Sequence, residues 1–498
     1  ATPTFLNAGR ARRGELVSCF LLEVDDSLNS INFIDSTAKQ LSKIGGGVAI
    51  NLSKLRARGE AIKGIKGVAK GVLPVAKALE GGFSYADQLG QRPGAGAVYL
   101  NIFHYDVEEF LDTKKVNADE DLRLSTISTG LIVPSKFFDL AKEGKDFYMF
   151  APHTVKQEYG VTLDDIDIEK YYDELVANPN VLKKKKDARE MLNMIAQTQL
   201  QSGYPYLMFK DNANKVHANS NIGQIKMSNL CTEIFQLQET SIINDYGIED
   251  EIKRDISCNL GSLNIVNVME TGKFRDSVHT GMDALTVVSD EANIQNAPGV
   301  KKANNELHSV GLGVMNLHGY LAKNKIGYES EEAKDFANIF FMMMNYYSIE
   351  RSMEIAKERG EAYQDFDKSD YASGKYFDFY TSQEFVPQFE KVKELFANMH
   401  IPTSEDWKSL QQQVQEYGLY HAYRLAIAPT QSISYVQNAT SSVMPIVDQI
   451  ERRTYGNAET FYPMPFLSPE TMWYYKSAFN TDQMKLIDLI STIQTHVD

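Results

Sequence analysis

The chain contains few cysteines and tryptophans for its length, with three cysteines and two tryptophans among 498 residues. The cysteines, Cys19, Cys231 and Cys258, are too few and odd in number for the disulfide scaffold of an extracellular protein, which favours a cytoplasmic location. Their spacing does not match a zinc site, and the nine histidines are scattered. No metal site is therefore predicted.

The sequence also lacks a long apolar run and an excess of positive charge. No stretch of about 18 apolar residues occurs, so no membrane span is predicted, and no signal peptide opens the chain. The net charge of −15 disfavours a general surface for a nucleic acid polymer. Single nucleotides are not excluded, because they need only a few local cations and backbone amides.

Short apolar runs alternate with helical patterns along the chain. Residues 47–52, 130–133 and 424–428 predict buried strands, whereas 330–358 and 187–201 predict helices. This alternation predicts an α/β fold with largely parallel strands, as two or three domains or as one large barrel. The lysines of 183–186 are interpreted as a solvated helix face.

The neighbours of Cys231 suggest chemistry. In an extended stretch, Asn229, Cys231 and Glu233 share one face and present an amide, a thiol and a carboxylate. A carboxylate acts as a base, an amide orients a hydroxyl, and a thiol serves as nucleophile or radical. The alternative is a buried structural cysteine with polar neighbours. Cys19 and Cys258 are either inert packed thiols or a dithiol pair, which spacing does not decide.

Two further segments have the composition of phosphate contacts. Residues 429–434, Pro-Thr-Gln-Ser-Ile-Ser, follow an apolar run and are good helix-start residues. A helix N-terminus holds phosphate without a cationic side chain, although a plain capped helix has the same sequence. The glycines of 45–47 fit close backbone approach, or an ordinary turn.

The segments around the three cysteines resemble the catalytic subunit of class I ribonucleotide reductases. Residues 18–19, 228–233 and 257–264 occur in the order of that family, and the resemblance covers essentially the whole chain. The sequence around Cys258 is most similar to the class Ib branch. The resemblance implies one catalytic domain over 1–498, a ten-stranded α/β barrel with a finger loop that carries Cys231 inside it. It also implies a helical effector and dimer region at roughly 20–70.

The resemblance implies a mechanism for reducing ribonucleoside diphosphates to deoxyribonucleoside diphosphates. Cys231 carries a thiyl radical that removes the C3′ hydrogen, Glu233 takes the 3′-hydroxyl proton, and Asn229 holds the ribose hydroxyls. Cys19 and Cys258 supply two electrons and form a disulfide. Because water and oxidants quench a radical, Cys231 is expected to be buried.

The resemblance also assigns binding residues. The substrate contacts are Thr2, Ser18, Gly47, Asn229, Leu230, Glu233, Pro429, Thr430, Gln431, Ser432 and Ile433. The residues for an allosteric deoxynucleotide or ATP are Asp26, Arg56, Ile62 and Lys63, of which Lys63 replaces a frequent arginine. Gln88, Gln91 and Arg92 belong to a glycine-rich loop that passes the effector signal to the substrate base.

The implied partners are a second copy of the chain, a metal-containing small subunit that delivers the radical, and a thioredoxin- or glutaredoxin-like reductant. No covalently bound cofactor is implied. The family's C-terminal radical tyrosines and cysteine tail are expected beyond the 498 residues given. Tyr474 and Tyr475 are instead interpreted as core aromatics, and an N-terminal activity-control module is not visible.

Three other hypotheses remain open at this stage. A cobalamin-dependent reductase shares the barrel and the chemistry, but no cobalamin-binding insertion is obvious. A nucleotide-binding regulator would not need three cysteines and Glu233. An α/β scaffold with buried thiols would not bring Cys19 and Cys258 together.

Overall fold

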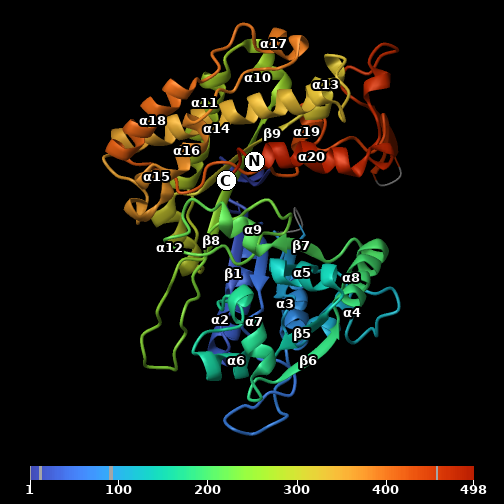
Figure 1. Ribbon diagram of the computed structural model, residues 1–498, viewed down its shortest axis with the longest axis vertical. Coiled ribbons are helices and arrows are strands. Elements are labelled where there is room, and N and C mark those ends of the chain that lie inside the picture. The colour runs from blue at the N-terminus through green and yellow to red at the C-terminus, as the bar shows by residue number, and fades with distance from the viewer. Residues whose placement is uncertain (1, 11–13, 89–92, 456–457) are drawn as a thin grey trace. The chain divides into compact units, whose positions relative to one another are not determined.

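The computed structural model describes residues 2–10, 14–88, 93–455 and 458–498. The chain divides into two compact units, which are described separately. The sheet unit comprises Gly9–Ser257 and Asn293–Asn305, and the helical unit comprises Ala1–Ala8, Cys258–Ala292 and Glu306–Asp498. Figure 1 shows the elements of both. The assignment of the whole chain to one catalytic domain stays a prediction.

The sheet unit is built on parallel strands in the order β7-β4-β3-β2-β1. Parallel strands are covered on both faces, so their sequences are almost continuously apolar. Residues such as Val48, Ile50 and Leu131 are fully buried. The strands are β1 Cys19–Glu23, β2 Gly47–Asn51, β3 Ala95–Asn101, β4 Ser128–Val133 and β7 Tyr206–Phe209.

Helices connect and cover these strands. They are α2 Leu28–Lys43, α3 Leu73–Tyr85, α4 Val107–Asp112, α5 Ser135–Glu143, α6 Pro152–Tyr159, α7 Ile168–Ala177, α8 Ala188–Ser202 and α9 Lys210–Lys215. Asp187 caps α8, and its carboxylate accepts from the amides of Arg189 and Glu190. Within the region of roughly 20–70, α2 is the helix and lies in sequence between β1 and β2.

The lysines of 183–186 lie on a strand, so their interpretation as a helix face is wrong. Strand β6, Lys183–Asp187, pairs antiparallel with the apolar strand β5, Asp146–Phe150. The amines of Lys184 and Lys186 lie 3.2 and 3.0 Å from the carboxylate of Glu108. Strand pairing together with these ion pairs outweighs the helical propensity of lysine.

The helical unit contains the long helix that the sequence predicts. Helix α14, Glu331–Arg359, begins after the N-cap Ser330 and ends at Gly360, whose φ is +72°. Its other elements are α1 Thr2–Asn7, α10 Ile265–Thr271, α11 Phe274–Asp290, β9 Val310–Met315, α13 Leu317–Lys323, α15 Asp370–Ser373, α16 Asp378–Thr381, α17 Glu390–Phe396, α18 Ser404–Tyr417, α19 Gln431–Val436, β10 Ile450–Tyr455, β11 Ala458–Pro463 and α20 Gln483–Gln494. Strand β8, Ile256–Asn264, and helix α12, Pro298–Leu307, cross the division between the units.

The strand predicted at 424–428 is wrong, because only Leu425 forms a bridge, with Leu312 of β9. The backbone amides of Arg424 and Leu425 donate instead to the carboxylate of Asp498, at 2.5 and 2.9 Å. The segment therefore pairs with β9 only briefly, where the amide of Leu312 donates to the carbonyl of Arg424 at 2.8 Å, and a side chain binds the amides of Arg424 and Leu425.

The other predicted elements are confirmed, and the fold is mixed α/β. Tyr475 is buried in a core cluster and Tyr474 packs against it, as interpreted from the sequence. In the described part of the chain, no helix is long and apolar enough to cross a membrane.

Candidate active site

Cys231 lies at the tip of a long loop in the sheet unit, here called the Cys231 loop (residues 224–238). The two arms of the loop meet at its base, where Ile225 and Leu237 form an antiparallel bridge. The amide of Gln238 also donates to the carbonyl of Gln224 at 3.1 Å. The base is therefore closed by backbone hydrogen bonds, whereas the tip depends on side chains.

The tip is a turn rather than the extended stretch that was expected. The side-chain oxygen of Asn229 accepts from the backbone amides of Glu233, at 2.9 Å, and Ile234, at 3.1 Å. Thr232 has a φ of +63°, in the left-handed region that β-branched residues rarely adopt. An asparagine that bonds to the backbone ahead of it favours such turns, so Asn229, Cys231 and Glu233 do not share the face of a strand.

The turn buries its residues to different degrees. Asn229 is buried, Glu233 is half-buried and Cys231 is exposed. The expectation that Cys231 is buried is therefore wrong for this structure. The reason is local, because the backbone reverses at Thr232 and leaves Cys231 at the tip.

Glu233 has the protonation behaviour of a base poised near neutral pH. Burial raises the pKa of Glu233 to about 7. Its hydrogen bonds, of which the one with the Asn229 side chain has the largest effect, lower the pKa, but burial outweighs them. A carboxyl group with a pKa near the working pH is suited to exchanging a proton with a substrate hydroxyl.

Tyr99 of β3 supports the turn and was not identified from the sequence. Its hydroxyl donates to the carbonyl of Asn229 at 2.7 Å and lies 3.3 Å from Oγ1 of Thr232. The ring needs the space left by Gly130 of β4, where an added Cβ would lie 2.4 Å from a ring carbon. Tyr99 is fully buried, and a tyrosine in an apolar strand gives no sequence signal of this role.

The first residues of β1 and β2 lie beside the Cys231 loop. Cys19 pairs with Gly47, and the amide of Gly47 donates to the carbonyl of Ser18 at 2.7 Å. A Cβ on Gly47 would lie 3.5 Å from a methyl carbon of Leu230. The sheet unit thus gathers predicted residues from three distant parts of the sequence: Ser18, Cys19, Gly47, Asn229, Leu230, Cys231 and Glu233.

Cys258 is buried in the helical unit. A Cβ added to Gly311 of β9 would lie 3.0 Å from the sulfur of Cys258 and 2.9 Å from the Cβ of Ala426. Cys258 therefore packs beside the segment that leads to Pro429. Because Cys19 belongs to the sheet unit, the Cys19–Cys258 pair stays a prediction.

The segment 429–433 contains the helix start that the sequence predicts. Helix α19 begins at Gln431, and Oγ1 of Thr430 accepts from the amide of Ser442 at 2.9 Å. Pro429, Gln431 and Ser432 are exposed, whereas Ile433 is half-buried. Thr2 begins α1, and its side chain lies outside the described part of the structure.

The predicted effector residues come together in the sheet unit. The guanidinium of Arg56 lies 2.9 Å from the carboxylate of Asp26 and donates to the carbonyl of Ala61 at 2.5 Å. Ile62 and Lys63 follow directly and are exposed, with Lys63 at a φ of +50° in a tight turn. Arg56 therefore links Asp26 to the backbone that directly precedes Ile62 and Lys63.

The glycine-rich loop is described only in part. Gln88 is buried, and its side-chain oxygen occupies the space beside Gly45, which has a φ of +94°. Gln88 therefore lies against Gly45, two residues before Gly47, which is one of the predicted substrate contacts. The other two predictions in this loop, Gln91 and Arg92, lie outside the described residues.

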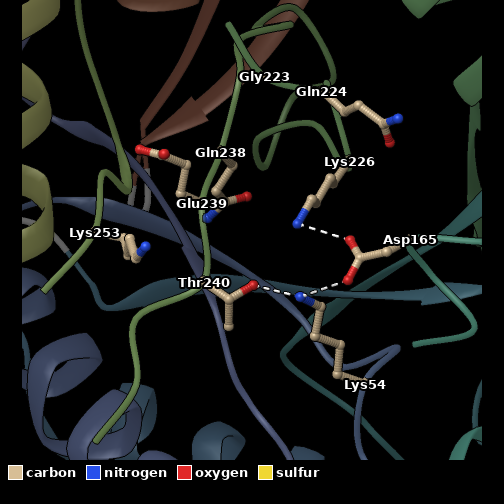
Figure 2. A pocket seen from close by; sticks show the side chains of 9 residues that line it. All are labelled: Lys54, Asp165, Gly223, Gln224, Lys226, Gln238, Glu239, Thr240 and Lys253. Atoms are coloured by element: carbon tan, nitrogen blue, oxygen red, sulfur yellow. Dashed lines mark hydrogen bonds and ion pairs between the residues drawn. The ribbon is translucent and has the colours of Figure 1, made fainter. Parts of the chain in front are cut away.

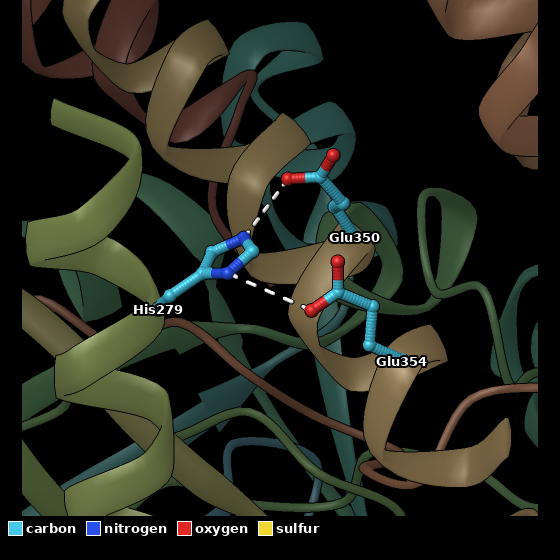
Figure 3. A group of neighbouring side chains, drawn as sticks. All are labelled: His279, Glu350 and Glu354. Carbon is cyan, nitrogen blue, oxygen red and sulfur yellow. Dashed lines mark hydrogen bonds and ion pairs between the residues drawn. The ribbon is translucent and has the colours of Figure 1, made fainter. Parts of the chain in front are cut away.

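One group of side chains in the described residues has the spacing of metal ligands. His279 of α11 lies between Glu350 and Glu354 of α14, with its nitrogens 2.9 and 3.7 Å from the two carboxylates (Figure 3). Arg275 already pairs with both carboxylates, at 2.8 and 3.0 Å. We interpret this group as an ion-pair network that joins two helices.

Known proteins resemble this chain over its whole length. The chain is 57% identical over 498 residues to the ribonucleoside-diphosphate reductase subunit alpha of Bacillus subtilis, covering 100% of this chain and 71% of that protein. It is 44% identical over 506 residues to the subunit of the same name from Mycoplasma pneumoniae, covering 100% of this chain and 70% of that protein.

The family comparison agrees with these relatives. Residues 17–498 match the model described as "Ribonucleotide reductase, barrel domain". This range includes Cys19, the Cys231 loop and Cys258, and the resemblance inferred from the three cysteine segments is confirmed. The chain belongs to the ribonucleotide reductase family, as the barrel domain of an alpha subunit.

Proposed function

We propose that this chain reduces ribonucleoside diphosphates to 2′-deoxyribonucleoside diphosphates and so supplies precursors for DNA. The observation that carries the proposal is the turn that presents Cys231 between Asn229 and Glu233, with its neighbour Leu230 against Gly47, the residue that pairs with Cys19. An amide, two thiols and a carboxylate are thereby available to one small substrate.

Each residue of the turn has a role in this reaction. A thiyl radical on Cys231 removes the hydrogen from C3′, and Glu233 takes the proton of the 3′-hydroxyl. Because the oxygen of the Asn229 side chain closes the turn, its amide group, which also bonds to Glu233, is the donor for the ribose hydroxyls. The 2′-hydroxyl then leaves as water.

Cys19 and Cys258 supply the two electrons. Their two S–H bonds break and one S–S bond forms. One of the two hydrogens replaces the lost hydroxyl at C2′, and the other is the proton with which that hydroxyl leaves as water. Glu233 returns its proton to the 3′ oxygen. Cys231 returns its hydrogen to C3′ and becomes a thiyl radical again. This step requires the two units to bring Cys19 and Cys258 within disulfide distance.

The fold proposed for the working enzyme is a ten-stranded α/β barrel with the Cys231 loop as its finger loop. The closed base and the long arms of the loop support this assignment. Since Cys231 is exposed in this structure, its shielding during catalysis is assigned to bound substrate and to the rest of the barrel.

The substrate diphosphate is proposed to bind at residues 429–433, with Thr2, Ser18 and Gly47 as further contacts. Exposed Ser432 near the start of α19 offers a hydroxyl and a backbone amide to a phosphate oxygen. The packing of Cys258 beside Ala426 supports a location of this segment near the reacting ribose.

A deoxynucleotide or ATP is proposed to bind at Asp26, Arg56, Ile62 and Lys63 and to act through the loop that contains Gln88. Each effector then favours one loop arrangement, and each arrangement favours one substrate base. The position of Gln88 against Gly45 supports this route. The working assembly is proposed to be a homodimer in the cytoplasm, with a radical-supplying small subunit and a thioredoxin- or glutaredoxin-like reductant.

The experiment is turnover of a ribonucleoside diphosphate by the full-length protein with its small subunit, a dithiol and each effector in turn. Deoxynucleotide formation that disappears in Cys231→Ser, with nucleotide binding intact, supports the proposal. Nucleotide binding without turnover in the wild-type protein would indicate a regulator instead.

A further inference from the structure

Four charged side chains form a network at the base of the Cys231 loop, here called the charge clamp (Glu23, Lys54, Asp165 and Lys226). Lys226 lies on the arm that leads to Cys231, and its Nζ lies 3.3 Å from Glu23 and 3.0 Å from Asp165. Nζ of Lys54 lies 3.4 Å from Glu23 and 3.0 Å from Asp165. Figure 2 shows both amines directed at the carboxylate of Asp165.

The other arm of the loop is bound to the carboxylate of Glu23. Thr240 follows the loop by two residues, and its hydroxyl donates to Glu23 at 2.6 Å. The same hydroxyl accepts from Nζ of Lys54 at 2.5 Å. Glu23 therefore holds the incoming arm through Lys226 and the outgoing arm through Thr240.

Because the side chains of the charge clamp are largely buried, each charge depends on its partner within the clamp for stabilisation. The side chain of Glu23 is 0% exposed, and those of Lys54 and Lys226 are 6% and 10% exposed. Desolvation alone would lower the pKa of Lys226, but Glu23 and Asp165 raise it above its ordinary value. A buried charge that loses its partner is strongly unfavourable, so these contacts resist sliding.

The clamp also fixes which part of the loop lies beside which part of the sheet. Glu23 ends β1 and Cys19 begins it. Lys226 meets Glu23, and four residues later Leu230 lies against Gly47, the residue of β2 that pairs with Cys19. The step of four residues from Lys226 to Leu230 thus matches the step of four residues from Glu23 back to Cys19. This register places Cys231 at the end of β1 where Cys19 lies.

We propose that the charge clamp positions Cys231 for catalysis, by fixing the register of the Cys231 loop against β1. The proposal rests on the proposed function, in which Cys231 and Cys19 act on one ribose. Glu23, Lys226 and Thr240 are positioning residues, because they lie at the base of the loop rather than at its tip.

Positioning of this kind has a defined kinetic signature. Hydrogen transfer depends steeply on geometry, and a misplacement of about 1 Å costs on the order of 100-fold in rate. The proposed contacts with the substrate diphosphate lie outside the Cys231 loop, whereas Asn229 and Glu233 at its tip act on the reacting ribose. Loosening the clamp therefore lowers kcat much more than it changes KM.

The test compares Lys226→Met with two other variants in the full-length protein combined with its small subunit. Lys226→Arg keeps the charge. Lys114→Met is the matched control, because Lys114 is a buried lysine that donates to the carbonyls of Leu124 and Ile127 and, in the described part of the chain, has no contact with the charge clamp. We expect kcat to fall at least about tenfold in Lys226→Met, with KM within about twofold, recovery in Lys226→Arg and no change in Lys114→Met.

A second measurement does not require turnover. The rate at which iodoacetamide modifies Cys231, read by peptide mass spectrometry, should change at least about threefold in Lys226→Met and stay unchanged in Lys114→Met. Thr240→Val removes the hydroxyl that donates to Glu23 and accepts from Lys54, but it leaves all four charges in place, so it tests the clamp if Lys226→Met does not fold. It should shift both readouts in the same direction.

Wild-type kcat in folded Lys226→Met, or a rise in KM that accounts for its whole loss of activity, would overturn the proposal. An unchanged rate of Cys231 modification in both Lys226→Met and Thr240→Val would do the same. A wild-type protein without reductase activity contradicts the proposed function instead, and the modification rates still decide whether the clamp sets the position of Cys231.

Discussion

The hydroxyl of Tyr99 donates a 2.7 Å hydrogen bond to the carbonyl of Asn229, which ties the middle of β3 to the turn that presents Cys231. Tyr99→Phe removes this bond and the contact with Thr232 while keeping the ring. We expect a loss of about 1 kcal/mol in the free energy of unfolding, and a several-fold lower kcat with nucleotide affinity retained.

Tyr172→Phe is the control for that variant, because the Tyr172 hydroxyl bonds to the backbone of Tyr148 and Asp146, away from the loop. Chemical denaturation and steady-state kinetics check both variants. Equal effects of the two substitutions on kcat would show that Tyr99 has no special relation to Cys231.

The raised pKa of Glu233 predicts the pH dependence of activity. Glu233 accepts a proton only as the carboxylate, so kcat/KM should rise with pH and level off above about 7. Glu233→Gln should abolish turnover at every pH. A rising limb centred near pH 4.5 would mean that burial does not control this carboxyl group.

The same shift predicts a change in stability. A carboxyl group whose pKa is higher in the folded state binds protons more tightly there, so stability falls as pH rises from about 4.5 to 7 and is then constant. At pH 8, Glu233→Gln should therefore be more stable than the wild-type protein, by about 3 kcal/mol. Thermal unfolding at pH 5 and pH 8 checks this, and a gain that is larger at pH 5 contradicts it.

Arg56 connects Asp26 to the turn that contains Ile62 and Lys63. Arg56→Ala should weaken deoxynucleotide effector binding at least about tenfold, because charge-assisted contacts of arginine are strong. Arg58→Ala is the matched control, since Arg58 is largely exposed and pairs with Glu109 at 3.5 Å. Calorimetric titration of an effector measures both, and equal affinity in the two variants refutes the assigned site.

Asp498 stabilises the segment that leads to the proposed phosphate site. Its carboxylate lies 2.7 Å from the fully buried guanidinium of Arg424 and accepts two backbone amides. Asp498→Asn should lower the free energy of unfolding by about 3 kcal/mol and raise the KM for substrate.

Asp488→Asn is the surface control for Asp498→Asn, because Asp488 pairs with the half-exposed Lys334 of α14. Its effect on stability should be below about 1 kcal/mol. Comparable losses in the two variants would mean that the burial of Arg424 adds nothing to its pairing with Asp498.

The sequence predicts the structure correctly where the local pattern of residues determines it. Apolar runs predicted β2 and β4, and the Ser330 and Gly360 boundaries of α14 follow from capping chemistry. The residues gathered at the Cys231 loop were also named in advance, because the family resemblance supplied their identities.

The sequence failed where distant side chains decide the structure. Nothing near Arg424 indicates that Asp498 will bind its backbone, and nothing near Lys226 indicates Glu23 as its partner. The turn at Cys231 depends on which backbone amides Asn229 accepts. Such contacts are set by tertiary packing, which periodicity does not encode.

The most direct measurement of the central claim is a single turnover by the reduced full-length protein with its small subunit and without added dithiol. Peptide mapping afterwards should find a Cys19–Cys258 disulfide in an amount equal to the deoxynucleotide formed, with Cys231 still a thiol. Deoxynucleotide formation with Cys19 and Cys258 both reduced, or with Cys231 in the disulfide, would contradict the account.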